Sequence, residues 1–200
     1  MPPNFEYEQQ HAGLVAGIDE AGRGPWAGPV VAAAVILDVK NIPQGIDDSK
    51  KLSAAKREAL FDFIMQHAQV GVGLASVDEI DQLNILGATK LAMQRALTAL
   101  PVRADVALVD GNQPPKLPCT AISIIKGDSK SLSIAAASII AKVTRDRMMC
   151  ELAREFPHYG WEKNAGYGTA LHQKGLAEFG VTPHHRRSFA PIRELLARAA

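Results

Sequence analysis

The sequence of 200 residues has few of the features that mark secreted, membrane-spanning or fibrous proteins. It contains only two cysteines, Cys119 and Cys150, which argues against a disulfide scaffold and favours a reducing cytoplasm. No stretch approaches the ~18 consecutive apolar residues of a membrane span, and the polar N-terminus does not resemble a secretory signal. With 47% hydrophobic and 22% charged residues, the chain is expected to form a single globular domain over residues 1–200.

The net charge of +1 hides an uneven distribution along the chain. Residues 1–141 carry 12 Lys and Arg against 15 Asp and Glu, whereas residues 142–200 carry 10 against 6. A basic C-terminal segment beside an acidic body hints at a polyanionic partner, although charge counts alone do not separate this interpretation from chance.

Hydrophobic periodicity predicts a layered α/β domain with a helical C-terminal part. Strands are expected at 14–18, 28–37, 70–75, 106–109 and 121–125. Helices are expected at 53–67, capped by Ser53, and at 84–100, 133–156, 169–179 and 191–199. No linker or repeat divides the chain, so we expect a core at about 13–160 that continues into a helical part at about 161–200.

Acidic residues follow three of the apolar runs. Asp19 and Glu20 follow LVAGI, Asp110 follows VALV, and Asp128 follows AISIIKG. If the strands are neighbours, four carboxylates meet at one edge of the sheet, where hard oxygen ligands suit Mg²⁺ or Mn²⁺. A pair of such ions about 3.5–4 Å apart can clamp both the attacking and the leaving oxygen of a phosphoryl displacement. Any single one of these acids has the alternative reading of a polar loop residue.

Adjacent residues on a regular strand point to opposite faces, so Asp19 and Glu20 need a break in geometry to share a site. Gly22 and Gly24 follow directly, and we therefore expect Asp19 to point in from the strand and Glu20 from the turn. The segment GRGPWA matches G-x-G-x-x-G/A, but a strand-like run follows it where a dinucleotide site needs a helix. The loop is better suited to bring its backbone, with Arg23 beside it, close to a sugar-phosphate chain.

Six motifs occur together and in order: IDEAGRGPWAGPVVAAAVIL, DDSKKLS, LVDGN, KGDSKSLSIAAASIIAKVTRD, GYGTALH and HHRRSF. With these motifs, the chain resembles the bacterial ribonuclease HII family from about residue 13 to 191. The resemblance implies a ribonuclease H-like mixed sheet flanked by helices, with a helical C-terminal extension. It also implies an endonuclease that uses Mn²⁺ or Mg²⁺, with two ions when substrate is bound. Such an enzyme cuts the RNA strand of RNA–DNA hybrids and cuts 5′ to ribonucleotides in duplex DNA, leaving a 5′-phosphate and a 3′-hydroxyl.

The resemblance also implies a role for individual residues. Asp19, Glu20, Asp110 and Asp128 match the four acids of the family's active site, which are both catalytic and metal-binding. Gly22, Arg23 and Gly24 match the loop that reads the ribose 2′-hydroxyl. Tyr167 matches the tyrosine that stacks on the sugar at the RNA-to-DNA junction, and Lys50 matches a lysine that contacts phosphate.

Other residues are interpreted from their surroundings in the sequence. Tyr167 lies between glycines, and an exposed ring there would be a good stacking platform. Adjacent histidines rarely bind one ion, so the segment His184 to Arg187 is taken as a basic turn in which Arg186 and Arg187 face phosphate or support the structure. Lys142 and Asp146 have the spacing of a helical ion pair, and Lys142 or Arg145 is a candidate counter-charge to the acids.

Two further classes of function stay open at this point. One is a non-catalytic module that binds RNA–DNA hybrids, which would be expected to lack one or more of the four acids. The other is a related metal nuclease, such as a resolvase-like protein or ribonuclease HIII, but ribonuclease HIII has Glu where this chain has Asp128. We expect a cytoplasmic monomer whose partners are RNA–DNA hybrid and ribonucleotide-containing duplex DNA, without a membrane partner.

Overall fold

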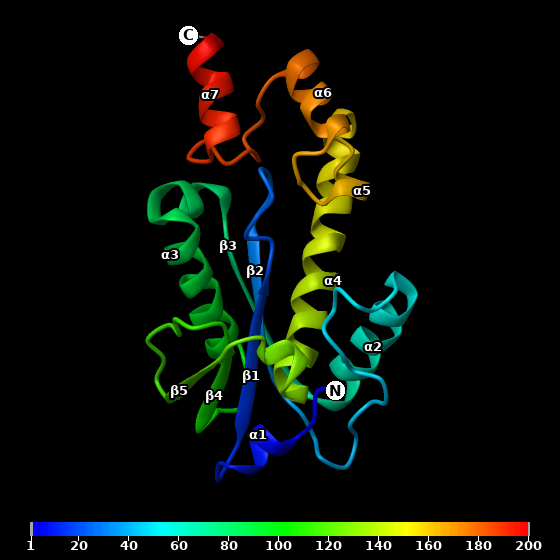
Figure 1. Cartoon of the computed structure of the whole chain (residues 1–200), viewed down its shortest axis with the longest axis vertical. Coiled ribbons are helices and arrows are strands. Elements are labelled where there is room, and N and C mark those ends of the chain that lie inside the picture. Colours follow the sequence, from blue (N-terminus) through cyan, green and yellow to red (C-terminus); the bar gives the residue numbers. More distant parts are fainter. Residues whose placement is uncertain (1, 200) are drawn as a thin grey trace.

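Five strands form one mixed sheet with helices on both faces (Figure 1). The structure is a computed structural model that describes residues 2–199. The strands lie in the order β3-β2-β1-β4-β5. β1 pairs antiparallel with β2, and β2 with β3, whereas β1–β4 and β4–β5 are parallel. The strand bounds are β1 (Val15–Ala21), β2 (Val30–Ile36), β3 (Gln69–Ala75), β4 (Val106–Asp110) and β5 (Thr120–Ile124).

The helices cover both faces of the sheet and build the far end of the molecule (Figure 1). α3 packs on one face, α4 packs on the other, and α2 lies outside α4. No helix within residues 2–199 is both long and apolar enough to cross a membrane. The bounds are α1 (Glu6–Gln9), α2 (Ala54–His67), α3 (Val77–Thr98), α4 (Leu132–Glu155), α5 (Trp161–Asn164), α6 (Ala170–Phe179) and α7 (Ala190–Ala199), with short 3-10 turns η1 (Gly127–Ser129) and η2 (Pro157–Tyr159).

The predicted α/β fold is confirmed, and the small residues of the central strands explain how closely its layers pack. Every residue of β2, with the sequence VVAAAVI, is buried. Ala32 belongs to the cluster under α3, and Ala33 to the cluster under α4, as the alternation of a strand requires. At Gly17 of β1, a β-carbon would overlap the backbone of Ser133. The start of α4 therefore lies directly against the strand that ends in the acidic pair.

The helix expected at 84–100 is the second part of a longer, kinked element. α3 begins after Ser76, which forms a capping box with Glu79. Asn84 interrupts it with φ 57° and caps the second part, because its Oδ1 accepts from the backbone N–H of Leu86 at 2.9 Å. The sequence pattern predicted the helix start at Asn84 and missed the earlier start after Ser76. It also missed the short elements α1, η2 and α5.

A third hydrophobic cluster joins the end of α4 to the C-terminal helices. Met149 and Ala153 of α4 pack there with Trp161, Leu176 and Ile192. The earlier part of the same helix, from Ala135 to Val143, belongs to the cluster against the sheet. Since one continuous helix takes part in both cores, we infer that residues 2–199 form one domain.

Two fully buried histidines lie inside this third cluster. His185 Nδ1 accepts from the backbone N–H of Thr182 at 2.9 Å, so its proton is on Nε2, which donates to His172 Nε2 at 3.0 Å. Trp161 Nε1 also donates to His172 Nε2, at 3.2 Å. The remaining proton of His172 is therefore on Nδ1, which donates to the carbonyl of Tyr167 at 3.0 Å. Both imidazoles are neutral in this arrangement.

This chain of hydrogen bonds predicts sensitivity to acid. Burial, followed by repulsion from His172, lowers the pKa of His185 to about 3 from its usual 6.5. Because the folded-state pKa lies below the unfolded one, the stabilisation is complete above about pH 6.5 and is lost as the pH falls from there toward 3. In His185→Asn, the amide oxygen accepts from Thr182 but cannot be protonated. Below pH 6 the wild type should lose stability relative to this variant by up to about 1.4 kcal/mol per pH unit. Urea unfolding at several pH values measures this, and equal slopes for the two proteins would contradict the assignment.

Candidate active site

The acidic edge of the sheet is the end at which the adjacent parallel strands β1 and β4 carry Asp19 and Asp110. Asp19 lies on the face of β1 that carries Gly17 and α4. Its side chain is only 6% exposed, and Oδ1 accepts from the backbone N–H of Glu20 at 2.7 Å. β1 and β4 are parallel and pair Ile18 with Val109, so Asp19 and Asp110 are the next residues along two adjacent strands. The structure thus places these two carboxylates side by side at one sheet edge.

Asp128 is tied to this edge through Asp110. The Asp110 Oδ1 accepts from the backbone N–H of Gly127 at 2.7 Å. Gly127 opens the η1 turn, and Lys126 before it has φ 55°, which reverses the chain after β5. Asp19, Glu20 and Asp128 line one cavity of about 290 Å³. The predicted convergence of acidic residues from separate strands therefore exists in the structure.

The expectation that Glu20 reaches in from the turn is wrong. β1 continues to Ala21, and Glu20 is still paired with Ala32 of β2. β4 has already ended at Asp110, so no strand lies beside Glu20 on that side. The cavity at this edge is therefore open to side chains from both faces of the sheet. Glu20 Oε1 accepts from Arg23 Nη1 at 3.3 Å.

The acids repel one another in a partly dry environment. Burial first, and then repulsion from Glu20 and Asp110, raise the pKa of Asp19 well above its usual range. Burial also raises the pKa of Glu20, although Arg23 opposes the rise. Burial, together with repulsion from Asp48 and Asp110, raises the pKa of Asp128. A cation at this edge would relieve both the burial and the repulsion.

The donor set fits a hard divalent cation completed by other ligands. Across residues 2–199, no three His, Cys, Asp or Glu side chains are gathered closely enough to hold an ion by themselves. Mg²⁺ is usually held by one or two carboxylates together with water and substrate phosphates, and it does not need such a group. Asp19 and its neighbours offer carboxylate oxygens and a negative charge that Arg23 and Lys50 only partly offset, which are the two properties that such a site requires.

Arg186 supports the glycine loop, residues 22–29, which lies beside the acids. Its Nε donates to Gly28 O at 3.0 Å, Nη1 donates to Arg23 O at 3.0 Å, and Nη2 donates to Gly22 O at 2.6 Å and Pro29 O at 3.2 Å. Arg186 is 0% exposed. The prediction that Arg186 faces phosphate is therefore corrected, because its donors all point to backbone carbonyls. The structure bears out the other reading, a supporting role within the fold.

Arg145 supports the same loop from α4. It is buried and donates to the carbonyls of Pro29 at 2.9 Å, Ala27 at 3.0 Å and Ala165 at 2.9 Å. Burial lowers the pKa of Arg145 to about 10 and that of Arg186 to about 9. At neutral pH both remain charged.

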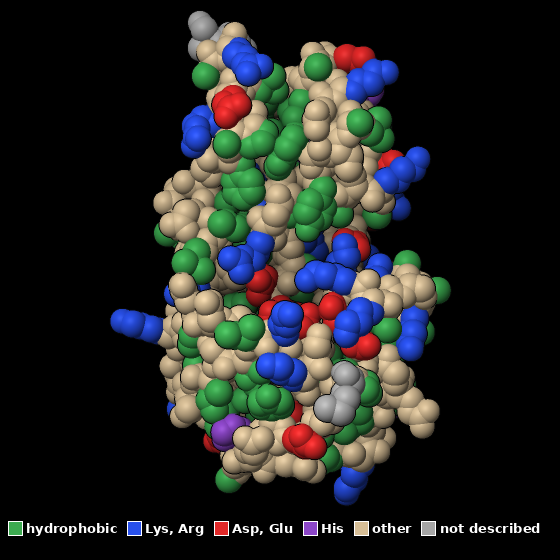
Figure 2. Space-filling model, in the orientation of Figure 1, with side chains coloured by type: hydrophobic (Ala, Val, Ile, Leu, Met, Phe, Trp, Pro, Cys, Tyr) green, Lys and Arg blue, Asp and Glu red, His purple; other side chains and the backbone are tan. Residues whose placement is uncertain are grey.

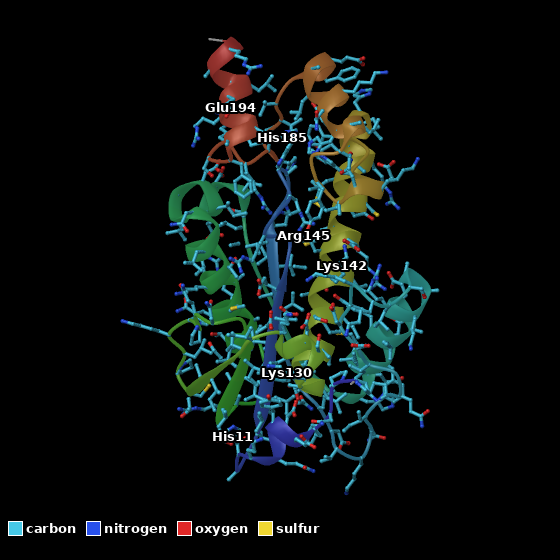
Figure 3. All side chains as sticks on the ribbon, viewed as in Figure 1. His11, Lys130, Lys142, Arg145, His185 and Glu194 are labelled. Carbon is cyan, nitrogen blue, oxygen red and sulfur yellow. The ribbon has the colours of Figure 1, made fainter. Side chains whose placement is uncertain are left out.

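Lys142 lies one helical turn before Arg145 and lines the acidic cavity (Figure 3). The predicted ion pair between Lys142 and Asp146 is present at 2.8 Å. Neither candidate counter-charge is free for that role, because the donors of Arg145 bond to backbone carbonyls and Lys142 is paired with Asp146. The cations that lower the pKa values of the acids are Arg23, acting on Glu20, and Lys50, acting on Glu20 and Asp128.

Tyr167 closes the other side of the cavity. Its side chain is 50% exposed, and a β-carbon added to Gly24 would lie 3.2 Å from its ring. The backbone N–H of Trp26 donates to Gly166 O at 2.8 Å. This bond joins the glycine loop to the tyrosine loop, residues 165–169. The predicted reading loop and the predicted stacking residue are thus neighbours.

Basic side chains surround the acids on the surface. Figure 2 shows a band of acidic side chains bordered by Lys and Arg on this face of the molecule. Lys50 is exposed and lines the cavity. Arg187 is also exposed, and its backbone N–H donates to Asp81 at 3.0 Å. Sequence reasoning missed Asp81, which lies in no quoted motif, and assigned no role to His172, the last residue of the motif GYGTALH. Their contacts depend on the fold.

Comparison with known proteins relates this chain to one family. The family model described as Ribonuclease HII matches residues 16–192. A ribonuclease HII of Magnetococcus marinus is 63% identical over 185 residues, covering 91% of this chain and 87% of that protein. The ribonuclease H2 structure from Pyrococcus horikoshii is 33% identical with a TM-score of 0.76, covering 92% and 97% of the two chains. A Bst ribonuclease HIII in complex with Mn²⁺ has a TM-score of 0.77 at 21% identity, covers 100% of this chain and 74% of its own, and supports the fold alone.

Removing one buried charge from the acidic edge should separate stability from activity. Asp19→Asn keeps an acceptor for the N–H of Glu20 but relieves repulsion, so without divalent metal it should be more stable by on the order of 1 kcal/mol at pH 7. The same variant should lose catalytic activity. Thermal unfolding in EDTA, with the exposed Asp62→Asn as the control, measures the first effect. A lower midpoint for Asp19→Asn than for wild type would contradict the proposed repulsion.

Proposed function

Because this chain belongs to the ribonuclease HII family and is a ribonuclease H, we propose that it is a metal-dependent endonuclease that cuts 5′ to ribonucleotides embedded in duplex DNA. We propose that it also cuts the RNA strand of RNA–DNA hybrids, the substrate on which its family acts. Both reactions would leave a 5′-phosphate and a 3′-hydroxyl. The observation that carries this proposal is the acidic sheet edge, which lies directly beside the glycine loop and Tyr167.

Asp19, Glu20, Asp110 and Asp128 are the residues that would hold Mn²⁺ or Mg²⁺, with a second ion when substrate is present. When bound, such ions lower the pKa of water and neutralise the charge that develops on phosphate oxygens. Asp19 is the most buried of the three acids that line the cavity, and its hydrogen bond to the N–H of Glu20 fixes the direction of its carboxylate. The Asp110 bond to Gly127 fixes the turn that presents Asp128.

The glycine loop and Tyr167 would select the sugar. The 2′-hydroxyl distinguishes RNA from DNA at a given nucleotide and needs a partner at close range. The backbone of Gly22, Arg23 and Gly24 lines the cavity, and the space left by the missing β-carbon of Gly24 faces Tyr167. Arg23 is exposed beside it. The half-exposed ring of Tyr167 is placed to stack on the neighbouring deoxysugar.

The exposed cations would bind the phosphate backbone. Lys50 lies at the cavity, and Arg187 lies on the surface beyond the buried Arg186. Both cysteines are free thiols, which fits the proposed cytoplasmic location. We further propose that the chain acts as a monomer.

The non-catalytic binding module is the weaker alternative, because all four acids are present and three of them line one cavity. A resolvase-like nuclease would have no use for a loop that admits a 2′-hydroxyl. The family membership also separates the chain from ribonuclease HIII.

Cleavage of three matched duplexes tests the proposal. One contains a single ribonucleotide in DNA, one is an RNA–DNA hybrid, and one is DNA alone. The protein should cut the first two with Mn²⁺ or Mg²⁺, leave the third intact, and cut nothing in EDTA. Asp110→Asn should lower the rate by more than about 100-fold, because the acids act together. Cutting in EDTA would contradict the metal dependence, and cutting of the hybrid alone would contradict the embedded-ribonucleotide activity.

A further inference from the structure

The side chain and the backbone of Tyr167 are held very differently. The ring is half exposed, and a β-carbon on Gly24 of the glycine loop would lie 3.2 Å from it. The backbone is held on both sides. Before it, Gly166 O accepts from Trp26 N–H at 2.8 Å; after it, the Tyr167 carbonyl accepts from the N–H of Thr169 at 2.8 Å and from His172 Nδ1 at 3.0 Å. The direction of the ring therefore depends on the backbone rather than on packing.

Within residues 2–199, His172 is the only side chain that bonds to the Tyr167 carbonyl. Its neighbours fix which of its two ring nitrogens carries the proton. Trp161 Nε1 is a donor and nothing else, so His172 Nε2 must accept from it. The Thr182 N–H likewise forces His185 to present a second N–H to the same Nε2. His172 is thus obliged to hold its proton on Nδ1, opposite the Tyr167 carbonyl.

The ring of His172 also contacts the underside of the glycine loop. It lies against Trp26 with ring centroids 5.8 Å apart. A β-carbon on Gly168 would overlap the Trp26 indole, so the tyrosine loop lies flat on that ring. The buried ring of His172 therefore contacts the glycine loop through Trp26 and the tyrosine loop through the Tyr167 carbonyl.

We propose that His172 is a positioning residue that sets the orientation of Tyr167 and thereby the preference for a single embedded ribonucleotide over continuous hybrid. This inference rests on the proposed role of Tyr167 as the stacking residue at the junction. A continuous hybrid presents ribose at every position of the cut strand and depends less on that contact. Loss of the Nδ1–H bond should therefore reduce cleavage of the single-ribonucleotide duplex more than cleavage of the hybrid.

Two near-isosteric substitutions separate this role from simple support of the core. In His172→Asn the amide N–H₂ takes the place of Nδ1 and can still donate to Tyr167 O, while the Nε2 acceptor is lost. In His172→Gln the amide oxygen takes the place of Nε2 and still accepts from Trp161 and His185, while the donor to Tyr167 is lost. Both variants remove one side of the ring, so both are expected to unfold at lower temperature.

The measurement is the ratio of kcat/KM on the single-ribonucleotide duplex to kcat/KM on the hybrid, with thermal midpoints recorded alongside. His172→Gln should lower this ratio by about 10-fold, and Tyr167→Ala by at least as much. His172→Asn should stay within about threefold of wild type. The exposed His158→Ala, whose ring only stacks on Phe179, is the matched control and should leave the ratio unchanged.

Trp161→Phe provides a second variant in case His172→Gln does not fold. It removes one bond on the Nε2 side and keeps the Nδ1–H bond, so the ratio should be unchanged even if the midpoint falls.

The proposal is overturned if Trp161→Phe or His172→Asn lowers the ratio as much as His172→Gln does, because general support of the core would then explain the effect. If Tyr167→Ala leaves the ratio unchanged, the role of Tyr167 itself is refuted. If Tyr167→Ala moves the ratio and His172→Gln does not, only the role of His172 is refuted.

Discussion

The architecture of the site depends on a buried guanidinium that bonds to backbone carbonyls. Arg186 reaches Gly22, Arg23, Gly28 and Pro29, residues that precede it by about 160 positions in the chain. A buried charge is costly unless it is hydrogen-bonded, and here the carbonyls of an irregular loop provide the bonds. The loop in turn has few regular partners for those carbonyls. Each therefore satisfies the other, and the loop is held in one shape.

A second buried arginine, Arg145, joins the glycine loop to the tyrosine loop. Arg145 from α4 bonds to Ala27 and Pro29 of the glycine loop and to Ala165 of the tyrosine loop. Within the described part of the chain, neither arginine forms an ion pair with a carboxylate. Both guanidiniums bond to the backbone of the loop, and the acids lie beside that loop in the same cavity. At Gly22 a β-carbon would overlap Arg145, so the loop needs glycine there to lie close to its support.

Features that depend on short-range sequence patterns were predicted correctly from the sequence. Asp19 and Asp110 meet because β1 and β4 are adjacent and parallel, with Ile18 paired with Val109. That each acid comes directly after an apolar run was readable from LVAGIDE and VALVD. Ser53 was predicted as a helix cap and is one. Glu20 was misplaced because nothing in the sequence shows how far β1 remains paired with β2.

Long-range contacts account for the remaining errors. The segment HHRRSF looks like a basic patch, yet Arg186 points inward and only Arg187 remains exposed. The difference depends on which carbonyls lie beneath the segment, and those belong to residues near the other end of the chain. His172 ends the motif GYGTALH, but the sequence indicated no role for it, because that role depends on the direction of four hydrogen bonds inside the C-terminal core.

The most direct test of this account is the cleavage rate of Arg186→Lys on the single-ribonucleotide duplex, at saturating substrate and Mn²⁺. Lysine keeps the positive charge but offers a single ammonium in place of the planar fork, so it cannot bond to four carbonyls at once. If the loop depends on that fork, its displacement by about 1 Å should lower the rate by about 100-fold. A rate within threefold of wild type would show that Arg186 does not hold the loop, and would contradict the account.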